Sequence, residues 1–392
     1  MSLTYELELE INTGFTQADT ITCIAFSPTD LYIAAAIGTN VMIWDMAAGK
    51  LSYISPGRGA CLCLAWYGEH ALLAGRADGY LTQCHVIQET RAFEGCGQIV
   101  RGEDGGRISI SYLAISPDGS QLALGGGSHV SLWQKQDPDA VHVVWGHQNT
   151  LPKPRLGGMV LESPVDVTSL HFLGEEKVVA TYRSHGMQEY TINNGGVVSS
   201  AKSIAHNAPI AAASISQDRT KVVIPNNQSG FDVYDLDNGT LCAALRLDAH
   251  IINGGQFPAQ FIHAGAHIVG GGPKVVAIWH LSSQQRVLSI QFDDELHPDL
   301  SNALVEALAC NTASDSGDAA IRPFRLAVVT KPAALLIYRG RPINAAAAAS
   351  AGRGPSNPSF VYWILPVLCI VGAIMAAADR LRSYEVIKFF NF

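Results

Sequence analysis

A unit of four short strands joined by tight turns recurs along the first 340 residues of the chain. In residues 21–55, runs of alternating apolar and polar residues are separated by turn residues such as Gly, Asn, Pro and Asp, a pattern that predicts an antiparallel sheet. The first strands of successive units begin near residues 20, 60, 108, 167, 208, 256 and 304. Spacings of this length, repeated seven times, are typical of propeller blades. The sequence therefore predicts an all-β fold, a seven-bladed β-propeller.

The ends of several of these strands resemble the signatures of the WD40 repeat family. Trp44-Asp45 stands where that family's Trp-Asp dipeptide closes the third strand, and Gly146-His147 matches its Gly-His dipeptide. Residues at related positions in other units are Asp78, Trp133, His206, Tyr234, Asp235, His250 and Trp279. The resemblance covers residues 3–340 and implies a propeller in which these side chains have structural roles within the blades. It also implies a fold that binds other proteins through loops on its rim.

The seventh unit contains three recognisable strands and then reaches a segment rich in Ala, Gly and Pro. Residues 3–11, at the other end of the chain, alternate between polar and apolar side chains and have no other place to pair. We expect this N-terminal strand to complete blade seven, because closing the ring leaves no long sheet edge unpaired. WD40-type propellers usually close in this way. Residues 1–340 are thus predicted to form one propeller domain.

A second segment that constrains the chain is the apolar run Phe360–Ala378. Its 19 residues carry no charge, and at about 1.5 Å per residue they would span roughly 28 Å, close to the hydrocarbon thickness of a bilayer. Tyr362 and Trp363 lie at one end, where such rings favour the headgroup region, and Pro366 falls in the first two turns. The alternative, a buried core helix, would normally carry a polar stripe. The run is therefore predicted to be a transmembrane helix.

The segments around this helix predict how the chain is anchored. Residues 341–359 form a flexible Ala/Gly/Pro linker and residues 379–392 a short tail, while Gly372 and Ala376 have the spacing that lets two membrane helices approach. The N-terminus lacks the basic and apolar regions of a signal peptide. We expect a tail-anchored, single-pass protein with a cytosolic propeller, and the endoplasmic reticulum is favoured over the mitochondrial outer membrane.

Charge and motif content argue against several classes of function. The chain has 34 acidic and 26 basic residues and a formal charge of −8, which argues against a nucleic-acid binder. Its eight cysteines show no CxxC spacing, so reduced thiols are expected rather than disulfides or a zinc site. Neither an HExxH nor a GxSxG motif occurs. The sequence predicts a protein that is not an enzyme and needs no cofactor or metal.

The insertion at residues 148–166 is the strongest candidate for a partner contact. Long loops in compact folds often carry function, and this one places basic and apolar residues between prolines. The side chains expected to contact a partner protein are Lys153, Arg155, Met159 and Leu161. The leading hypothesis is a membrane-tethered, non-enzymatic scaffold that recruits proteins through its propeller loops.

The alternative function comes from the layout of the chain. It is similar to membrane-bound guanine-nucleotide exchange factors for Sar-type small GTPases in vesicle trafficking, which also place a seven-bladed propeller before a C-terminal membrane helix. This resemblance implies a small GTPase as partner. In those proteins the activity lies in a protruding, glycine-rich loop of the first blade, whereas the turns Ser27–Asp30 and Gly38–Asn40 of this chain are short.

Overall fold

The structure is a computed structural model, and residues Thr4–Arg341 form one compact unit within it. A second unit comprises Met1–Leu3 and Pro342–Phe392. The structure describes residues 3–11, 20–68, 71–87, 92–101, 105–137, 143–154, 164–193, 198–204, 209–226, 230–247, 257–292, 303–311, 324–331 and 334–342.

The described strands form seven four-stranded sheets, and the prediction of seven blades is confirmed. Blade one consists of β2 (Ile21–Phe26), β3 (Tyr32–Ile37), β4 (Asn40–Asp45) and β5 (Lys50–Pro56), blade two of β6 (Cys61–Tyr67), β7 (Ala71–Arg76), β8 (Tyr80–Ile87) and β9 (Ala92–Ile99), and blade three of β10 (Tyr112–Ile115), β11 (Gln121–Gly126), β12 (His129–Lys135) and β13 (Trp145–Thr150). Blade four consists of β14 (Val167–Phe172), β15 (Lys177–Tyr182), β16 (Gly186–Ile192) and β17 (Val198–Ile204), and blade five of β18 (Ser214–Ile215), β19 (Lys221–Asn226), β20 (Gly230–Asp235) and β21 (Leu241–Arg246). Blade six consists of β22 (Ala259–Ile262), β23 (His267–Gly272), β24 (Val275–His280) and β25 (Gln285–Gln291), and blade seven of β26 (Leu304–Cys310), β27 (Phe324–Lys331), β28 (Ala334–Pro342) and β1 (Leu3–Ile11).

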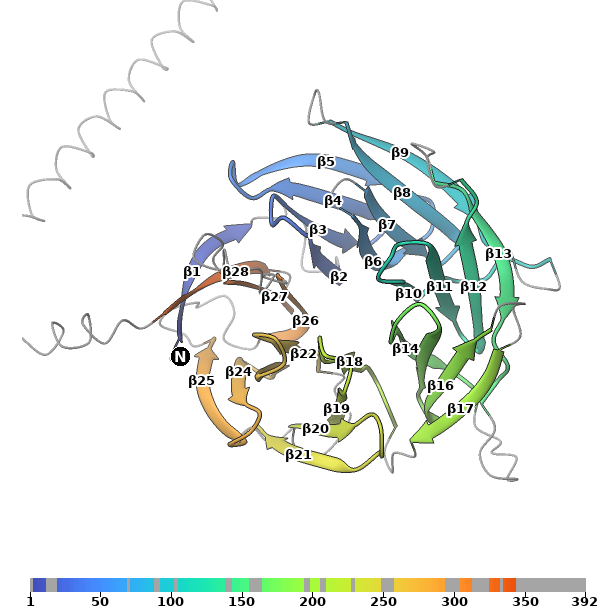
Figure 1. The fold of residues 1–392 in the computed structure, drawn as a ribbon. Coiled ribbons are helices and arrows are strands. Elements are labelled where there is room, and N and C mark those ends of the chain that lie inside the picture. The colour runs from blue at the N-terminus through green and yellow to red at the C-terminus, as the bar shows by residue number, and fades with distance from the viewer. Residues whose placement is uncertain are drawn as a thin grey trace, which may run out of the picture. The chain divides into compact units, whose positions relative to one another are not determined.

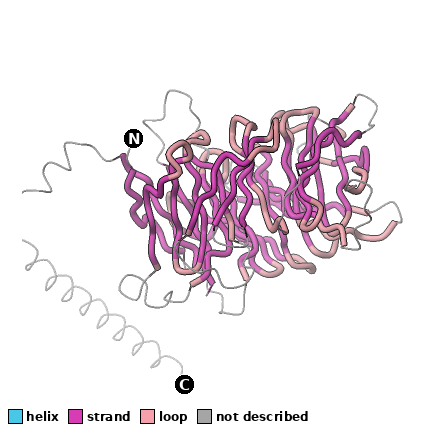
Figure 2. Tube along the Cα trace, turned by 90° about the horizontal axis from the view of Figure 1, so that it is seen from below, coloured by secondary structure: helices cyan, strands magenta, loops and turns pink. Residues whose placement is uncertain are grey.

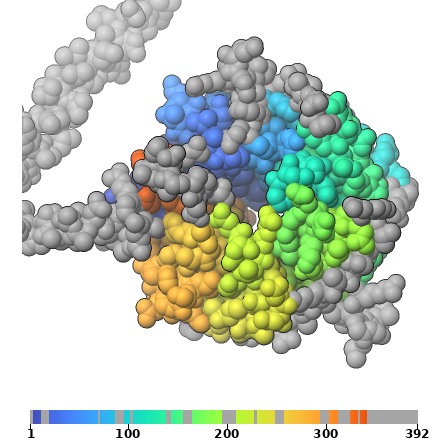
Figure 3. Space-filling view, in the orientation of Figure 1, coloured from blue at the N-terminus to red at the C-terminus, as the bar shows by residue number. Residues whose placement is uncertain are grey.

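The blades follow one another around a ring in chain order (Figures 1 and 3). We name the strands of each blade a to d from the centre outwards; the a strands β2, β6, β10, β14, β18, β22 and β26 surround the axis (Figure 1). Neighbouring strands of blades one to six are antiparallel. The strands therefore run between two faces of the ring (Figure 2). We call the face with the a–b and c–d turns the a–b face, and the opposite one the d–a face.

Blade seven joins the two ends of the propeller. Its sheet has the order β1-β28-β27-β26, so the N-terminal strand β1 is the outer strand of the blade. Ile11 of β1 is buried in a core cluster that also contains Ile24 of blade one and Ile337 of blade seven. The first and last blades therefore share a hydrophobic core with the strand that closes the ring.

Most of the core lies between neighbouring sheets. All residues of β3 and β7 are buried, including the short run of alanines in β3, because an inner strand of a propeller is covered by a blade on each side. Burial of both faces leaves few strand positions that need a charge, which agrees with a chain that is only 15% charged.

The a strand of blade five is shorter than its counterparts. It spans only Ser214–Ile215, although its run was expected to begin near residue 208. Ile210, which precedes it, is buried and donates its N–H to the carbonyl oxygen of Arg183 in blade four. That part of the chain therefore pairs with the preceding blade rather than with its own sheet.

The predicted anchor lies outside the described residues. β28 extends to Pro342, and the rest of the predicted linker, the apolar run 360–378 and the tail 379–392 are not described. Among the described residues, no helix is long and apolar enough to cross a membrane. The membrane residues Phe360, Tyr362, Trp363, Pro366, Gly372 and Ala376 thus remain predictions from sequence.

Candidate interaction surface

The aromatic signature positions mark a β-bulge that recurs from blade to blade. The pairing of the c and d strands shifts by one residue immediately before Trp44, Trp133, Tyr190, Tyr234 and Trp279. In each case the d strand carries one extra residue, as in blade one, where Ile43 pairs with Tyr53 and Trp44 with Leu51. A bulge bends and twists the strand that carries it. Tyr190 of blade four belongs to this set and was not singled out from the sequence.

The acidic signature residues fix the c–d turns. The Asp45 Oδ1 atom accepts hydrogen bonds from the backbone N–H groups of Ala47 and Ala48, at 2.8 and 2.9 Å. Asp235 repeats this arrangement with Asp237 and Asn238, at 2.9 and 3.0 Å. Short polar side chains of this kind satisfy turn N–H groups that have no strand partner.

The a–b turns of blades three and five are built in a second shared way. In blade three the Ser116 hydroxyl donates to Asp118 at 2.5 Å and accepts from the N–H of Gln121. In blade five the Ser216 hydroxyl donates to Asp218 at 2.5 Å. These hydroxyl donors lower the pKa of both carboxyl groups because they stabilise the ionised form.

The remaining signature residues occupy varied places. Trp133 is buried, its Nε1–H donates to Ser131 Oγ at 2.8 Å, and its ring meets the ring of His147 edge-on at 5.2 Å. Gly146-His147 lies within the outer strand β13 rather than directly before an a strand. The Asp78 Oδ1 atom accepts from the N–H of Tyr80 at 3.4 Å. His206 and His250 lie outside the described residues.

A buried arginine connects blades one and two at the d–a face. Arg76, at the end of β7, is 2% exposed. Its guanidinium donates to Thr82 Oγ1 at 2.8 Å and to three backbone carbonyl oxygens, those of Thr39, Gly59 and Ser55, at 2.6, 3.2 and 3.4 Å. Thr39 and Ser55 belong to blade one, so the side chain bridges two sheets that share no backbone ladder.

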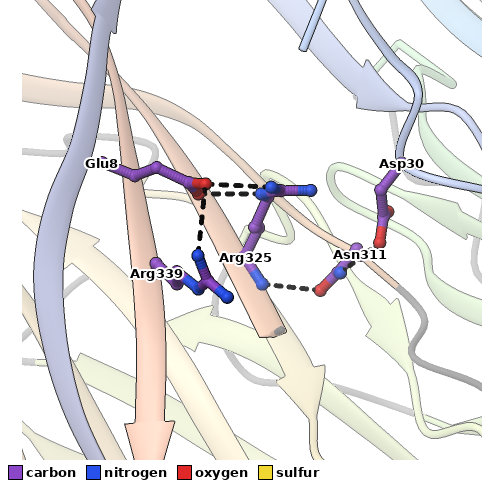
Figure 4. Close-up of polar contacts among 5 residues, drawn as sticks. All are labelled: Glu8, Asp30, Asn311, Arg325 and Arg339. Carbon is purple, nitrogen blue, oxygen red and sulfur yellow. Dashed lines mark hydrogen bonds and ion pairs between the residues drawn. The ribbon is translucent and has the colours of Figure 1, made fainter. Parts of the chain in front are cut away.

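A polar cluster holds the closing strand in place (Figure 4). Glu8 of β1 accepts two hydrogen bonds from Arg325 of β27, at 2.8 and 2.9 Å, and its carboxylate also lies 4.0 Å from Arg339. The N–H of Arg325 donates to Asn311, whose amide donates to Asp30 of blade one at 2.5 Å. A continuous set of contacts therefore runs from the N-terminal strand through blade seven to blade one.

Three neighbouring histidines of blade six, His263, His267 and His280, extend to the closing strand, which His263 contacts. The Tyr5 hydroxyl and His263 Nε2 share a hydrogen bond of 2.8 Å, and the His263 ring lies 4.3 Å from that of Phe324. His267 lies 5.4 Å from His263 and 4.9 Å from His280, between ring centres. Burial lowers the pKa of His263 to about 4 and also lowers that of His267.

This arrangement predicts that acid weakens the junction. Unfolded histidines bind a proton near pH 6.5, whereas His263 resists protonation until about 4, so the unfolded state gains protons first and stability falls as the pH drops through this window. We expect the melting temperature to decrease across it. His263→Asn should reduce that pH dependence, because Asn tolerates the left-handed backbone at this position (φ 52°) and does not titrate.

Melting curves at several pH values measure the effect. His147→Asn is the matched control, because it makes the same substitution at an exposed histidine in the outer strand of another blade and leaves His263 in place. Identical pH profiles for the wild type and His263→Asn would contradict the assignment.

The first residues after β13, Leu151 and Pro152, are fixed by contacts with the propeller. Leu151 is buried, and the carbonyl oxygen of Pro152 accepts a hydrogen bond from the Tyr190 hydroxyl at 3.0 Å. Tyr190 in turn accepts from the Tyr182 hydroxyl at 2.8 Å, and both tyrosines are 1% exposed. Lys153, which follows, is exposed. Arg155, Met159 and Leu161 lie outside the described residues.

Several thiols of the described residues are buried within the blades. No set of three His, Cys, Asp or Glu side chains among these residues could hold a metal ion. Burial raises the pKa of Cys61 to about 12 and that of Cys84 to about 11, so both stay protonated and are poor nucleophiles.

In the described part of blade one, the a–b and b–c connections are short turns between β2 and β3 and between β3 and β4.

Comparison with known proteins agrees with this architecture. The WD40 family model, described as WD domain, G-beta repeat, matches residues 10–45, which include the a, b and c strands of blade one. No curated protein matches the chain. WD40 propellers commonly bind proteins and are typically non-enzymatic. The chain is thus a seven-bladed β-propeller whose residues 10–45 match the WD40 repeat model, a fold that suggests a protein-interaction scaffold.

Proposed function

We propose that the protein is a membrane-tethered, non-enzymatic scaffold that recruits protein partners through the loop between β13 and β14. The observation that carries this proposal is the Pro152 carbonyl held by Tyr190 and Tyr182. A loop that starts from a fixed point loses less conformational freedom when a partner binds, which favours affinity. Functional loops on rigid scaffolds are commonly built in this way.

The other end of the loop is also attached to the blade. Asp166, just before β14, lies 3.6 Å from the guanidinium of Arg183, and its carbonyl oxygen accepts from the N–H of Arg183 at 2.8 Å. Both stems of the loop therefore rest on blade four at the d–a face. Basic and apolar residues in the loop, among them Lys153, Arg155, Met159 and Leu161, match a partner surface with acidic and apolar side chains.

The apolar run Phe360–Ala378 supports the membrane part of the proposal. It has the length and composition of a single span, and the Ala/Gly/Pro linker before it would let the propeller reach partners near the bilayer. The experiment is proximity labelling in cells with a labelling enzyme fused to residue 1. The full chain should sediment with membranes and label membrane proteins, and a chain ending at residue 342 should do neither. Equal labelling by both chains would contradict the tether.

A further inference from the structure

An open hollow lies on the a–b face, opposite the loop described above. It has a volume of about 420 Å³ and lies where the a strands of blades three, four and five end. Its apolar lining includes Ile115 of blade three, Leu170 and Phe172 of blade four and Ile215 of blade five, and its polar lining comes from His171, Ser216, Gln217 and Arg219. Three blades thus contribute apolar surface to a single concave site.

The histidine in this hollow is uncharged. The carbonyl oxygen of Ala213 can only accept, so His171 Nε2 is the donor of the 3.0 Å hydrogen bond between them. Burial lowers the pKa of His171 to about 4, and its ring therefore stays neutral at physiological pH. The nearby hydroxyl of Ser216 is already bonded to Asp218 at 2.5 Å. Neither group adds a positive charge to the site.

Arg219 supplies the free charge of the hollow. It lies in the a–b turn of blade five, where its N–H donates to the carbonyl oxygen of Ser216 at 2.8 Å. Its side chain is exposed and lines the hollow. Within the described residues, its guanidinium forms no ion pair. An unpaired cation beside apolar walls is complementary to an apolar side chain next to a carboxylate.

We infer that this hollow binds a linear peptide segment of a partner protein, with a large apolar side chain against Ile115, Phe172 and Ile215 and a neighbouring carboxylate on Arg219. The site is separate from the loop after β13 and lies on the other face of the ring. It gives the scaffold a second binding surface, which like the loop combines basic and apolar side chains but lies on a different face. A single propeller could then hold two partners at once.

Defined peptides test this inference. The probes are fluorescent dodecapeptides in a Gly-Ser background, each with one Phe and, one to three residues away, either Asp or Lys. The purified full-length protein should bind the Phe-Asp peptides about tenfold more tightly than the Phe-Lys peptides, a difference of the size that one charge pair gives. Arg219→Glu should reverse this preference.

Two controls complete the design. Lys50→Glu makes the same charge change on the a–b face of blade one, at an exposed position, and should leave the preference unchanged. Replacing residues 153–163 by a Gly-Ser turn should also leave it unchanged, which separates this site from the proposed partner loop. Absence of binding to any peptide, or a preference that Arg219→Glu does not alter, would overturn the inference.

Discussion

Deleting residues 1–12 is expected to unfold the propeller in one cooperative step. The deletion removes β1, so that β28 becomes a bare outer edge and the core shared by Ile11, Ile24 and Ile337 is opened to water. It also leaves Arg325 without its two bonds to Glu8. Domains of this kind are stable by only about 5–15 kcal/mol, and the loss of a full strand with its core contacts should remove that stability.

Urea unfolding followed by near-ultraviolet circular dichroism measures this effect. A chain ending at residue 342 is the control, because it keeps every strand of the propeller, and it should unfold like the intact chain. Glu8→Gln, which keeps the strand and weakens only the ion pairs, should cost about 1 kcal/mol, since the carboxylate is partly exposed. A deletion variant with a native-like transition would show that β1 does not hold the ring closed.

The second large effect is expected at Arg76. Arg76→Met should lower the free energy of unfolding by about 3–5 kcal/mol, because the substitution removes a buried cation and leaves the carbonyl oxygens of Thr39, Gly59 and Ser55 without this donor, that of Ser55 in a buried place. Arg76→Lys should recover only part of the loss. An ammonium group cannot reproduce the planar arrangement of N–H donors with which the guanidinium bonds to four acceptors.

Gly57 provides an internal check on this prediction. A Cβ atom at this position would lie 1.8 Å from Arg76 Nη1, so Gly57→Ala should displace the guanidinium and weaken its bonds. The same change should cost much less when residue 76 is Met. A double-mutant cycle by urea unfolding measures this coupling. Additive effects of the two substitutions would contradict the bridging role of Arg76.

The period of the propeller could be read from sequence because it depends on local patterns. Alternation and turn residues determine each strand and each hairpin, and Trp44-Asp45 marks both the bulge and the turn that close its third strand. The same local patterns did not predict that Gly146-His147 lies within the outer strand β13. Gly146 sits in the outer strand, where a Cβ atom would lie 1.8 Å from the Gln136 amide nitrogen, and its role there is to make room for that side chain.

The contacts that shape the candidate sites are of a different kind. Glu8 and Arg325 are 317 residues apart in the chain, and Tyr5 and His263 are 258 apart. No local pattern reports such a pair, because ring closure decides which side chains meet. The hydrogen bonds of the buried Arg76 and the hollow beside Arg219 likewise depend on how neighbouring blades pack, which the alternation of apolar and polar residues along a strand does not determine.

Recruitment of proteins through the loop between β13 and β14 can be measured by proximity labelling after the loop has been replaced. Residues 153–163 are replaced by a Gly-Ser turn, which keeps Leu151, Pro152 and the Asp166 stem in place. The control is the same replacement of residues 312–323, the connection between β26 and β27 on the other face. We expect the first variant to lose a defined set of labelled proteins and the control to retain it. A labelled set that is identical in the wild type and both variants would contradict the claim.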